Sequence, residues 1–105
     1  MKQLFLFIGL LITLSGFGQG SLSGTILDKN SQEPIPYASV VIKSDGNIVS
    51  GGITNEKGDF NVTNIKLGAY DFEVQFIGYK TVTTAVTLDK ANKKLNLGRI
   101  FIEED

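Results

Sequence analysis

Apolar and polar residues alternate along most of this 105-residue chain, and the alternation predicts short β-strands. In residues 70–77 aromatic and aliphatic side chains occupy every second position, with mostly polar side chains between them. Successive side chains of a strand point to opposite faces of its sheet, so this segment predicts one buried and one solvated face. A slip of one residue in its pairing would bury the carboxylates of Asp71 and Glu73, which specifies the register strongly.

The same texture recurs in six other segments, and turn residues separate them at intervals of about 8–12 residues, which is typical of β-sandwiches and barrels. No sustained helical period follows the first 18 residues. The sequence therefore predicts an all-β domain of about seven strands. The expected strands are residues 21–28, 37–43, 48–54, 59–65, 70–77, 80–88 and 95–102.

Glycines mark the expected irregularities of these strands. Ser44-Asp45-Gly46-Asn47 is a hairpin signal, because Asp-Gly readily adopts the two positive φ angles of a type I′ turn. Gly51-Gly52 interrupts the next strand and indicates either a β-bulge or a close approach of another backbone. The apolar positions change parity around Gly98, which predicts a bulge in the last strand.

The first 18 residues have the layout of a secretory signal peptide. Met1 and Lys2 give a positive start, an apolar run covers residues 4–14, and small residues precede a predicted cut after Gly18. The apolar run is short for a membrane span, which needs roughly 20 residues. An uncleaved membrane anchor is the alternative. The predicted organisation is a signal peptide over residues 1–18 and one exported domain over residues 19–105.

Composition argues against several classes of chemistry. The sequence has no histidine and no cysteine, which removes the commonest general base, thiolate catalysis and Cys/His zinc sites. No catalytic residue, metal ligand or cofactor is identified. Without Lys2 the chain carries nine basic and eleven acidic side chains, so its charge gives no reason to expect nucleic acid or direct membrane binding.

Two groups of residues remain candidates for small-molecule chemistry. Asp71 and Glu73 lie two positions apart on one strand, about 7 Å from each other, which overlaps the carboxylate spacing of inverting glycosidases. Such polar faces accompany most antiparallel sheets, so a solvated face is the favoured interpretation. Tyr37, Tyr70 and Tyr79 would form a platform for a sugar or peptide if at least two of the rings were coplanar and exposed.

An ordered set of short motifs covers nearly all of residues 21–102: Gly24-Thr25-Ile26-x-Asp28, Pro34-Ile35-Pro36-Tyr37-Ala38-Ser39-Val40, Gly52-x-Thr54-Asn55-x-x-Gly58-x-Phe60, Gly68-x-Tyr70 and Ile77-Gly78-Tyr79. The set resembles the carboxypeptidase regulatory-like domain of Bacteroidetes envelope proteins. This resemblance implies a seven-stranded antiparallel β-sandwich of the transthyretin-like kind. The signature positions, expected to be structural, are Gly24, Pro36, Ala38, Val40, Gly52, Thr54, Gly58, Phe60, Gly68, Tyr70, Gly78 and Tyr79.

In that family the domain is most often a periplasmic N-terminal extension of TonB-dependent outer-membrane receptors. The resemblance implies a non-catalytic interaction module at the periplasmic face of the outer membrane, with a receptor plug or barrel, or a TonB-system component, as partner. The sequence stops at Asp105, so we expect either the leading piece of a longer receptor or a stand-alone periplasmic or secreted module. The alternatives are a secreted carbohydrate- or peptide-binding module and an accessory domain of a carboxypeptidase-like enzyme.

A strand edge is the expected contact surface of such a module. Residues 81–87 are rich in β-branched side chains and would accept a partner's strand if they lay at the edge of a sheet. The residues expected to flank that contact are Thr81, Thr83 and Thr87.

Overall fold

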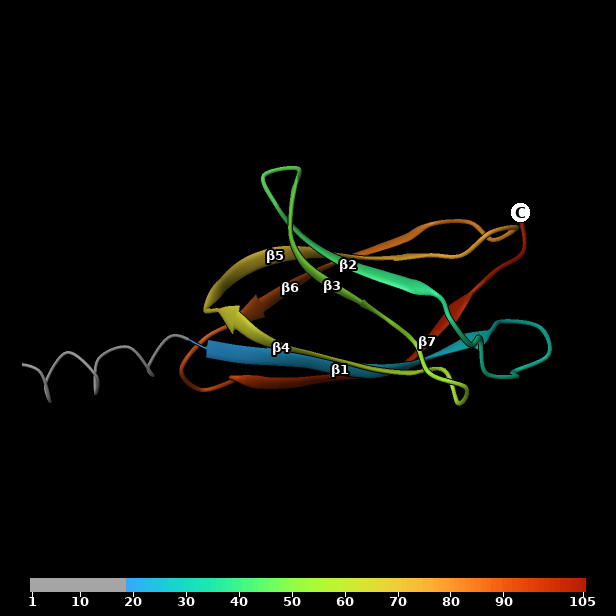
Figure 1. Ribbon diagram of the computed structural model, residues 1–105, viewed down its shortest axis with the longest axis horizontal. Coiled ribbons are helices and arrows are strands. Elements are labelled where there is room, and N and C mark those ends of the chain that lie inside the picture. Colours follow the sequence, from blue (N-terminus) through green and yellow to red (C-terminus); the bar gives the residue numbers. More distant parts are fainter. Residues whose placement is uncertain (1–18) are drawn as a thin grey trace, which may run out of the picture.

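The structure, a computed structural model, describes residues 19–105, and the predicted signal peptide lies outside them. The described residues form seven β-strands close to their predicted positions (Figure 1). Within this range no helix is long and apolar enough to cross a membrane. The strands are β1 (Gln19–Asp28), β2 (Ser39–Ser44), β3 (Asn47–Ile53), β4 (Asp59–Lys66), β5 (Gly68–Gln75), β6 (Val82–Leu88) and β7 (Lys94–Ile102).

The strands form two sheets that pack face to face, which confirms the predicted β-sandwich (Figure 1). One sheet has the order β4-β1-β7, and the other has the order β3-β2-β5-β6. The edges of the four-stranded sheet are therefore β3 and β6. The edges of the three-stranded sheet are β4 and β7.

One pair of neighbouring strands departs from the expected antiparallel arrangement. β1 and β7 run parallel, with Ser21 beside Lys94 and Asp28 beside Ile102. The cause is the path of the chain, because β6 ends at Leu88, at the end of the sandwich where β1 begins. β7 starts from that end and so runs in the same direction as β1. The other four pairs are antiparallel.

The two facing surfaces of the sheets are apolar and form one core. On β5, Phe72 and Val74 are fully buried, while Tyr70 is half-buried and packs against the core. Phe72 stacks on Phe60 of β4 across the sandwich, with 5.1 Å between ring centroids. Burying a side chain of this size contributes about 1.5–3 kcal/mol, so the alternation of β5 explains both its register and its share of the core.

The turn between β2 and β3 and the bulge in β7 agree with the sequence analysis. Asp45 and Gly46 both have positive φ angles, 51° and 81°, as a type I′ turn requires. The pairing of β1 with β7 shifts between Ser23 and Thr25, opposite the segment that contains Gly98. Gly98 has a φ of 70°, which confirms the predicted irregularity there.

The bulge in β3 lies at a different residue from the one expected. Ser50 pairs with Ile42 and Ile48 pairs with Lys43, so Val49 is the extra residue. Gly51-Gly52 pairs regularly with β2, and the bulge interpretation of these two glycines is wrong. Their other interpretation holds at Gly51, because a Cβ atom there would lie 2.8 Å from a β2 carbonyl oxygen.

Candidate functional site

The threonines expected to meet a partner lie along an edge of a sheet. β6 pairs with β5 and ends the four-stranded sheet. Thr81 precedes β6, Thr83 and Thr87 lie within it, and all three are exposed. Thr83 is opposite Glu73 on β5, which places it on the outer face of the sandwich. The geometry required for strand addition is therefore present at β6.

The opposite edge of the same sheet, β3, was not singled out by the sequence analysis. Every residue of β3 except Ser50 is exposed, and Ile48, Val49 and Ile53 are large apolar residues. The glycines in the strand weakened its apparent β-propensity and drew attention away from it. The available signal was the pair Ile48-Val49 directly after the hairpin turn. Two adjacent aliphatic residues cannot both point into the core from a regular strand.

Thr54, a signature position, is a structural residue at the end of β3. Its side chain is 1% exposed. The hydroxyl donates a hydrogen bond to the carbonyl of Ile35 and accepts one from the amide of Ala38, both at 2.8 Å. Thr54 thereby holds the loop between β1 and β2 against the end of β3. The hydroxyl is therefore buried and bound to two backbone groups, so it is not available to a ligand.

Other signature residues also serve the fold. Ala38, Val40 and Phe60 are buried in the core. Gly58 has a φ of 77°, and a Cβ atom at this position would lie 2.5 Å from the carbonyl oxygen of Ile26. Only glycine tolerates both the positive φ angle and the close contact, so Gly58 is needed for packing at the turn before β4. With Thr54, these five signature residues therefore serve the architecture of the domain.

A buried polar contact between Asp28 and Tyr79 joins the two sheets at one end of the sandwich. Asp28 ends β1 and is 8% exposed. Its carboxylate accepts hydrogen bonds from the amides of Asn30 and Ser31 at 2.8 and 2.9 Å and from the Tyr79 hydroxyl at 2.5 Å. The Tyr79 hydrogen bond is the largest cause of a lowered pKa at Asp28. The same hydrogen bond, with burial, raises the pKa of Tyr79 to about 12.

The three tyrosines do not form the exposed platform on which the carbohydrate-binding alternative depended. Tyr37 is 63% exposed, but Tyr70 and Tyr79 are half-buried. The Tyr70 hydroxyl donates to the carbonyl of Lys66 at 2.6 Å, and the Tyr79 hydroxyl donates to Asp28. Because two rings have their hydroxyls committed within the fold, a single exposed ring remains.

The carboxylates Asp71 and Glu73 lie on the outer face of β5, in agreement with the solvated-face interpretation. Glu73 forms an ion pair with Lys43 at 2.9 Å and accepts a hydrogen bond from Gln75 at 3.2 Å. The Lys43 contact is the largest cause of a lowered pKa at Glu73, which is the wrong direction for a general acid at neutral pH. Among residues 19–105 no group of three or more acidic side chains has the geometry to hold a metal ion.

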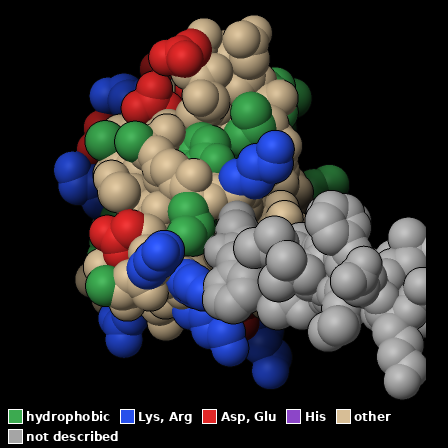
Figure 2. Space-filling model, turned by 90° about the vertical axis from the view of Figure 1, so that its left-hand side faces the viewer, with side chains coloured by type: hydrophobic (Ala, Val, Ile, Leu, Met, Phe, Trp, Pro, Cys, Tyr) green, Lys and Arg blue, Asp and Glu red, His purple; other side chains and the backbone are tan. Residues whose placement is uncertain are grey.

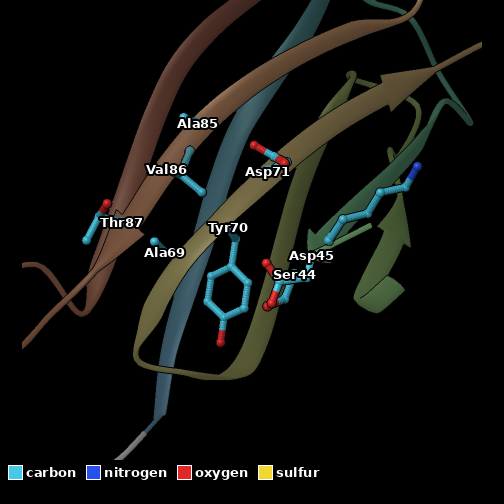
Figure 3. A pocket seen from close by; sticks show the side chains of 9 residues that line it. Ser44, Asp45, Ala69, Tyr70, Asp71, Ala85, Val86 and Thr87 are labelled. Carbon is cyan, nitrogen blue, oxygen red and sulfur yellow. The ribbon is translucent and has the colours of Figure 1, made fainter. Parts of the chain in front are cut away.

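A shallow hollow of about 210 Å³ lies beside these carboxylates, over the ends of β5 and β6 (Figure 3). Small side chains such as Ala69 and Ala85 leave the space, and Asp45 and Asp71 lie at its margin. The hydroxyl groups that line this hollow are those of Ser44, Tyr70 and Thr87. Seen from this end, the molecule shows both acidic and basic side chains and no field of a single sign (Figure 2).

Comparison with known proteins agrees with this architecture. Bacillopeptidase F of Bacillus subtilis (strain 168) is 34% identical over 76 residues, which cover 72% of this chain and only 5% of that protein. The crystal structure of BcpA, the major pilin subunit of Bacillus cereus, has a TM-score of 0.66 at 18% identity, covering 84% of this chain and 31% of the pilin. The 5-hydroxyisourate hydrolase of Klebsiella pneumoniae has a TM-score of 0.64 at 16% identity, covering 82% of this chain and 91% of the enzyme.

The two structural similarities are at low sequence identity and show the fold alone. The family is shown by a separate match, in which the model of the CarboxypepD_reg-like domain covers residues 22–99. That range includes β2 to β6 completely, β1 apart from its first three residues and β7 apart from its last three. This chain therefore belongs to the CarboxypepD_reg-like domain family.

Proposed function

We propose that this chain is a non-catalytic accessory module of an exported bacterial protein, and that it binds another protein along an uncharged edge of its four-stranded sheet. The observation that carries the proposal is a contrast between the two sheets. The edge strands β3 and β6 contain no charged residue, whereas β4 carries Asp59 and Lys66 and β7 carries Lys94 and Arg99. Charged side chains on an edge discourage pairing with another chain. Only the four-stranded sheet offers edges suited to strand addition.

The chemistry of the described residues supports a non-catalytic role. The signature residues are committed to packing, and the Asp71–Glu73 pair is neutralised in part by Lys43. The buried Asp28 has its oxygens occupied by two backbone amides and by Tyr79. No buried side-chain nitrogen or oxygen atom among residues 19–105 lacks a hydrogen-bond partner, as expected of polar groups that serve the fold.

The relatives support a module that forms part of a larger exported protein. The matching segment is 5% of Bacillopeptidase F and 31% of the Bacillus cereus pilin chain. For this chain we propose the periplasmic N-terminal domain of a TonB-dependent outer-membrane receptor, with the receptor plug or barrel, or a TonB-system component, as partner. An accessory domain beside a catalytic unit is the second candidate, and the similarity to Bacillopeptidase F favours it.

The reading frame of the gene beyond the codon for Asp105 separates these two candidates. A continuation into a plug and a long series of alternating strands supports the receptor assignment. A continuation into a hydrolase domain supports the accessory role and contradicts the receptor assignment. A stop codon at this position contradicts both and leaves a free exported module.

Photo-crosslinking in the producing cell tests the contact surface itself. A photoreactive amino acid replaces Thr83 on β6, Ile53 on β3 or, as a matched control, the exposed Thr63 on the charged edge β4. We expect crosslinks to another exported protein from at least one of the first two positions and none from Thr63. Equal crosslinking from all three positions, or none from either uncharged edge, would contradict binding by strand addition.

A further inference from the structure

Four of the six large exposed apolar side chains of the described residues lie along one edge of the sandwich, while Ile77 lies between β5 and β6 and Phe101 lies on β7. Ile48, Val49 and Ile53 lie on β3 and are 65%, 51% and 67% exposed. Tyr37 lies next to the end of that strand, because its amide donates to the carbonyl of Thr54 at 3.0 Å. In the described part of the chain no such residue lies on β6. The two uncharged edges therefore differ in the apolar surface that they offer.

The register of β3 places two of these side chains on the same face. Ile48 is opposite Lys43 and Ile53 is opposite Ser39, and both partners lie on the outer face of β2. Val41, half-buried on that face, lies between those two partners along β2. The bulge at Val49 produces this arrangement, because without the extra residue Ile48 would point inward. The side chains that β3 presents on the outer face of this edge, Ile48 and Ile53, are therefore apolar, and we call them the apolar strip.

The glycines of β3 leave the edge accessible, and only one of them is required by the fold. A Cβ atom at Gly51 would lie 2.8 Å from the carbonyl oxygen of Val40, so packing against β2 explains that glycine. At Gly52 a Cβ atom would meet its nearest neighbour at 3.6 Å, an ordinary contact, and the position has no positive φ angle. Gly52 is opposite Val40, and an added Cβ atom would face the side chains of Val62 and Val40 on the inner side of the sandwich. Because neither glycine has a side chain, the backbone at the centre of β3 stays open to an added strand.

Both ends of the strand open into hollows that could receive side chains of an added strand. Near Val49 a hollow of about 380 Å³ lies between β3 and the end of β4, with Ile65 and Tyr70 in its wall. Beyond Ile53 a wider depression of about 510 Å³ is lined by Tyr37 and the turn before β4. Charged residues line both hollows, and β3 itself is neutral. Lys43, opposite Ile48 on β2, is held in an ion pair with Glu73.

From these observations we propose that β3 is the edge that binds the partner, and that the bound element is an extended segment whose central residues are uncharged and aliphatic or β-branched. The inference rests on the proposed function and deepens it. The neutral strand determines the chemistry, since a charge placed opposite Ile48 or Ile53 would lose water without gaining an ionic partner. Backbone hydrogen bonds supply affinity, and the apolar strip with its flanking hollows supplies preference for alternate side chains.

Selection from a linear twelve-residue peptide display library tests this proposal on the protein purified after export. Binding of the selected peptides is then measured for Ile53→Lys on β3 and for Thr83→Lys on β6, a matched pair of exposed edge positions. We expect selected peptides with uncharged, β-branched centres. Ile53→Lys should weaken their binding at least tenfold, whereas Thr83→Lys should leave it within about twofold. Unchanged thermal unfolding of both variants shows that folding is preserved, and Ile53→Val should restore binding.

The other outcomes separate this inference from the proposed function. Loss of binding in Thr83→Lys alone would overturn the assignment to β3 and leave strand addition at the sheet edge intact. Selected peptides with charged centres would overturn the partner chemistry. Self-association that Ile53→Lys abolishes would assign the edge to a second copy of this chain. If no peptide binds, or if neither variant weakens binding, both the inference and edge binding fail.

Discussion

Tyr79 and Asp28 are 51 positions apart in the chain, and their side chains meet at 2.5 Å between the Tyr79 hydroxyl and Asp28 Oδ2. Tyr79 belongs to the connection between β5 and β6 in one sheet, whereas Asp28 ends β1 in the other. The contact closes the end of the sandwich opposite the start of β1. A backbone bridge between Tyr79 and Glu104 and the hydrogen bond from the amide of Asp105 to the carbonyl of Gly78 lie beside it.

The first prediction concerns the alkaline titration of Tyr79. Tyr79 has its pKa raised to about 12, first by the hydrogen bond to Asp28 and then by burial. We expect part of the phenolate absorbance to develop only near pH 12, and Tyr79→Phe should remove that part. The stabilisation from Tyr79 should be complete below its ordinary pKa of 10 and disappear as the pH rises through about 12. An absorbance change near pH 12 that Tyr79→Phe leaves intact would contradict the contact.

The second prediction concerns acid. The hydrogen bonds from Tyr79, Ser31 and Asn30 hold the pKa of Asp28 below its ordinary value of 3.8. A carboxyl group with a lowered folded-state pKa stabilises the protein above its unfolded-state pKa and loses that effect as the pH falls through the folded-state value. The wild type should therefore be more stable than Asp28→Asn at pH 7, with the difference shrinking below about pH 4. Urea unfolding of both proteins from pH 7 to pH 2.5 measures this difference in stability. A difference that does not change with pH would contradict a lowered pKa at Asp28.

The third prediction concerns the hydroxyl of Thr54. Thr54→Val keeps the shape of the side chain but leaves the amide of Ala38 and the carbonyl of Ile35 without their buried partner. Each unsatisfied buried group costs about 1–3 kcal/mol, so the free energy of unfolding should fall by roughly 2–6 kcal/mol. Thr54→Ser retains both hydrogen bonds and is the control, with an expected loss of about 1 kcal/mol for the missing methyl group. Equal losses in the two variants would show that the hydroxyl does not hold the loop.

The fourth prediction compares two glycines with positive φ angles. Gly46, at 81°, has no atom within 4 Å of an added Cβ, whereas at Gly58, at 77°, the added atom would lie 2.5 Å from the carbonyl oxygen of Ile26. Gly46→Ala should cost only the left-handed backbone conformation, about 1–2 kcal/mol. Gly58→Ala should cost clearly more, because the turn must also move away from β1. Chemical denaturation of both variants measures the difference, and similar losses would contradict a tight contact at Gly58.

The sandwich itself could be predicted from the sequence because each strand and turn has a recognisable local pattern of residues. The alternation in residues 70–77 specifies which face of β5 is buried, and Asp45-Gly46 specifies the hairpin that follows β2. The parallel pairing of β1 with β7 could not be read in the same way. The direction of β7 depends on the end of the sandwich at which β6 stops. That position is determined by the order and direction of all the strands and by no single segment.

The candidate site was predicted only in part, for a related reason. The sequence indicated a sheet edge as the contact surface, and β6 does lie at an edge. It gave no indication that β3 is the more apolar edge, because the bulge at Val49 changes the direction of Ile48 without a glycine or proline to mark it. The Asp28–Tyr79 contact was also invisible, since its two residues are distant in the chain and neither is unusual by itself.

The parallel pairing of β1 with β7 also determines how the module would respond to tension. The start of β1 and the end of β7 lie at opposite ends of the sandwich, at Gln19 and Ile102 (Figure 1). A pull that separates these two ends loads the hydrogen bonds between the strands in shear, so that they resist together instead of opening one at a time. An antiparallel pair would have placed both points of attachment at the same end and would have unzipped. A larger protein that transmits force along its chain could therefore carry this domain without unfolding it first.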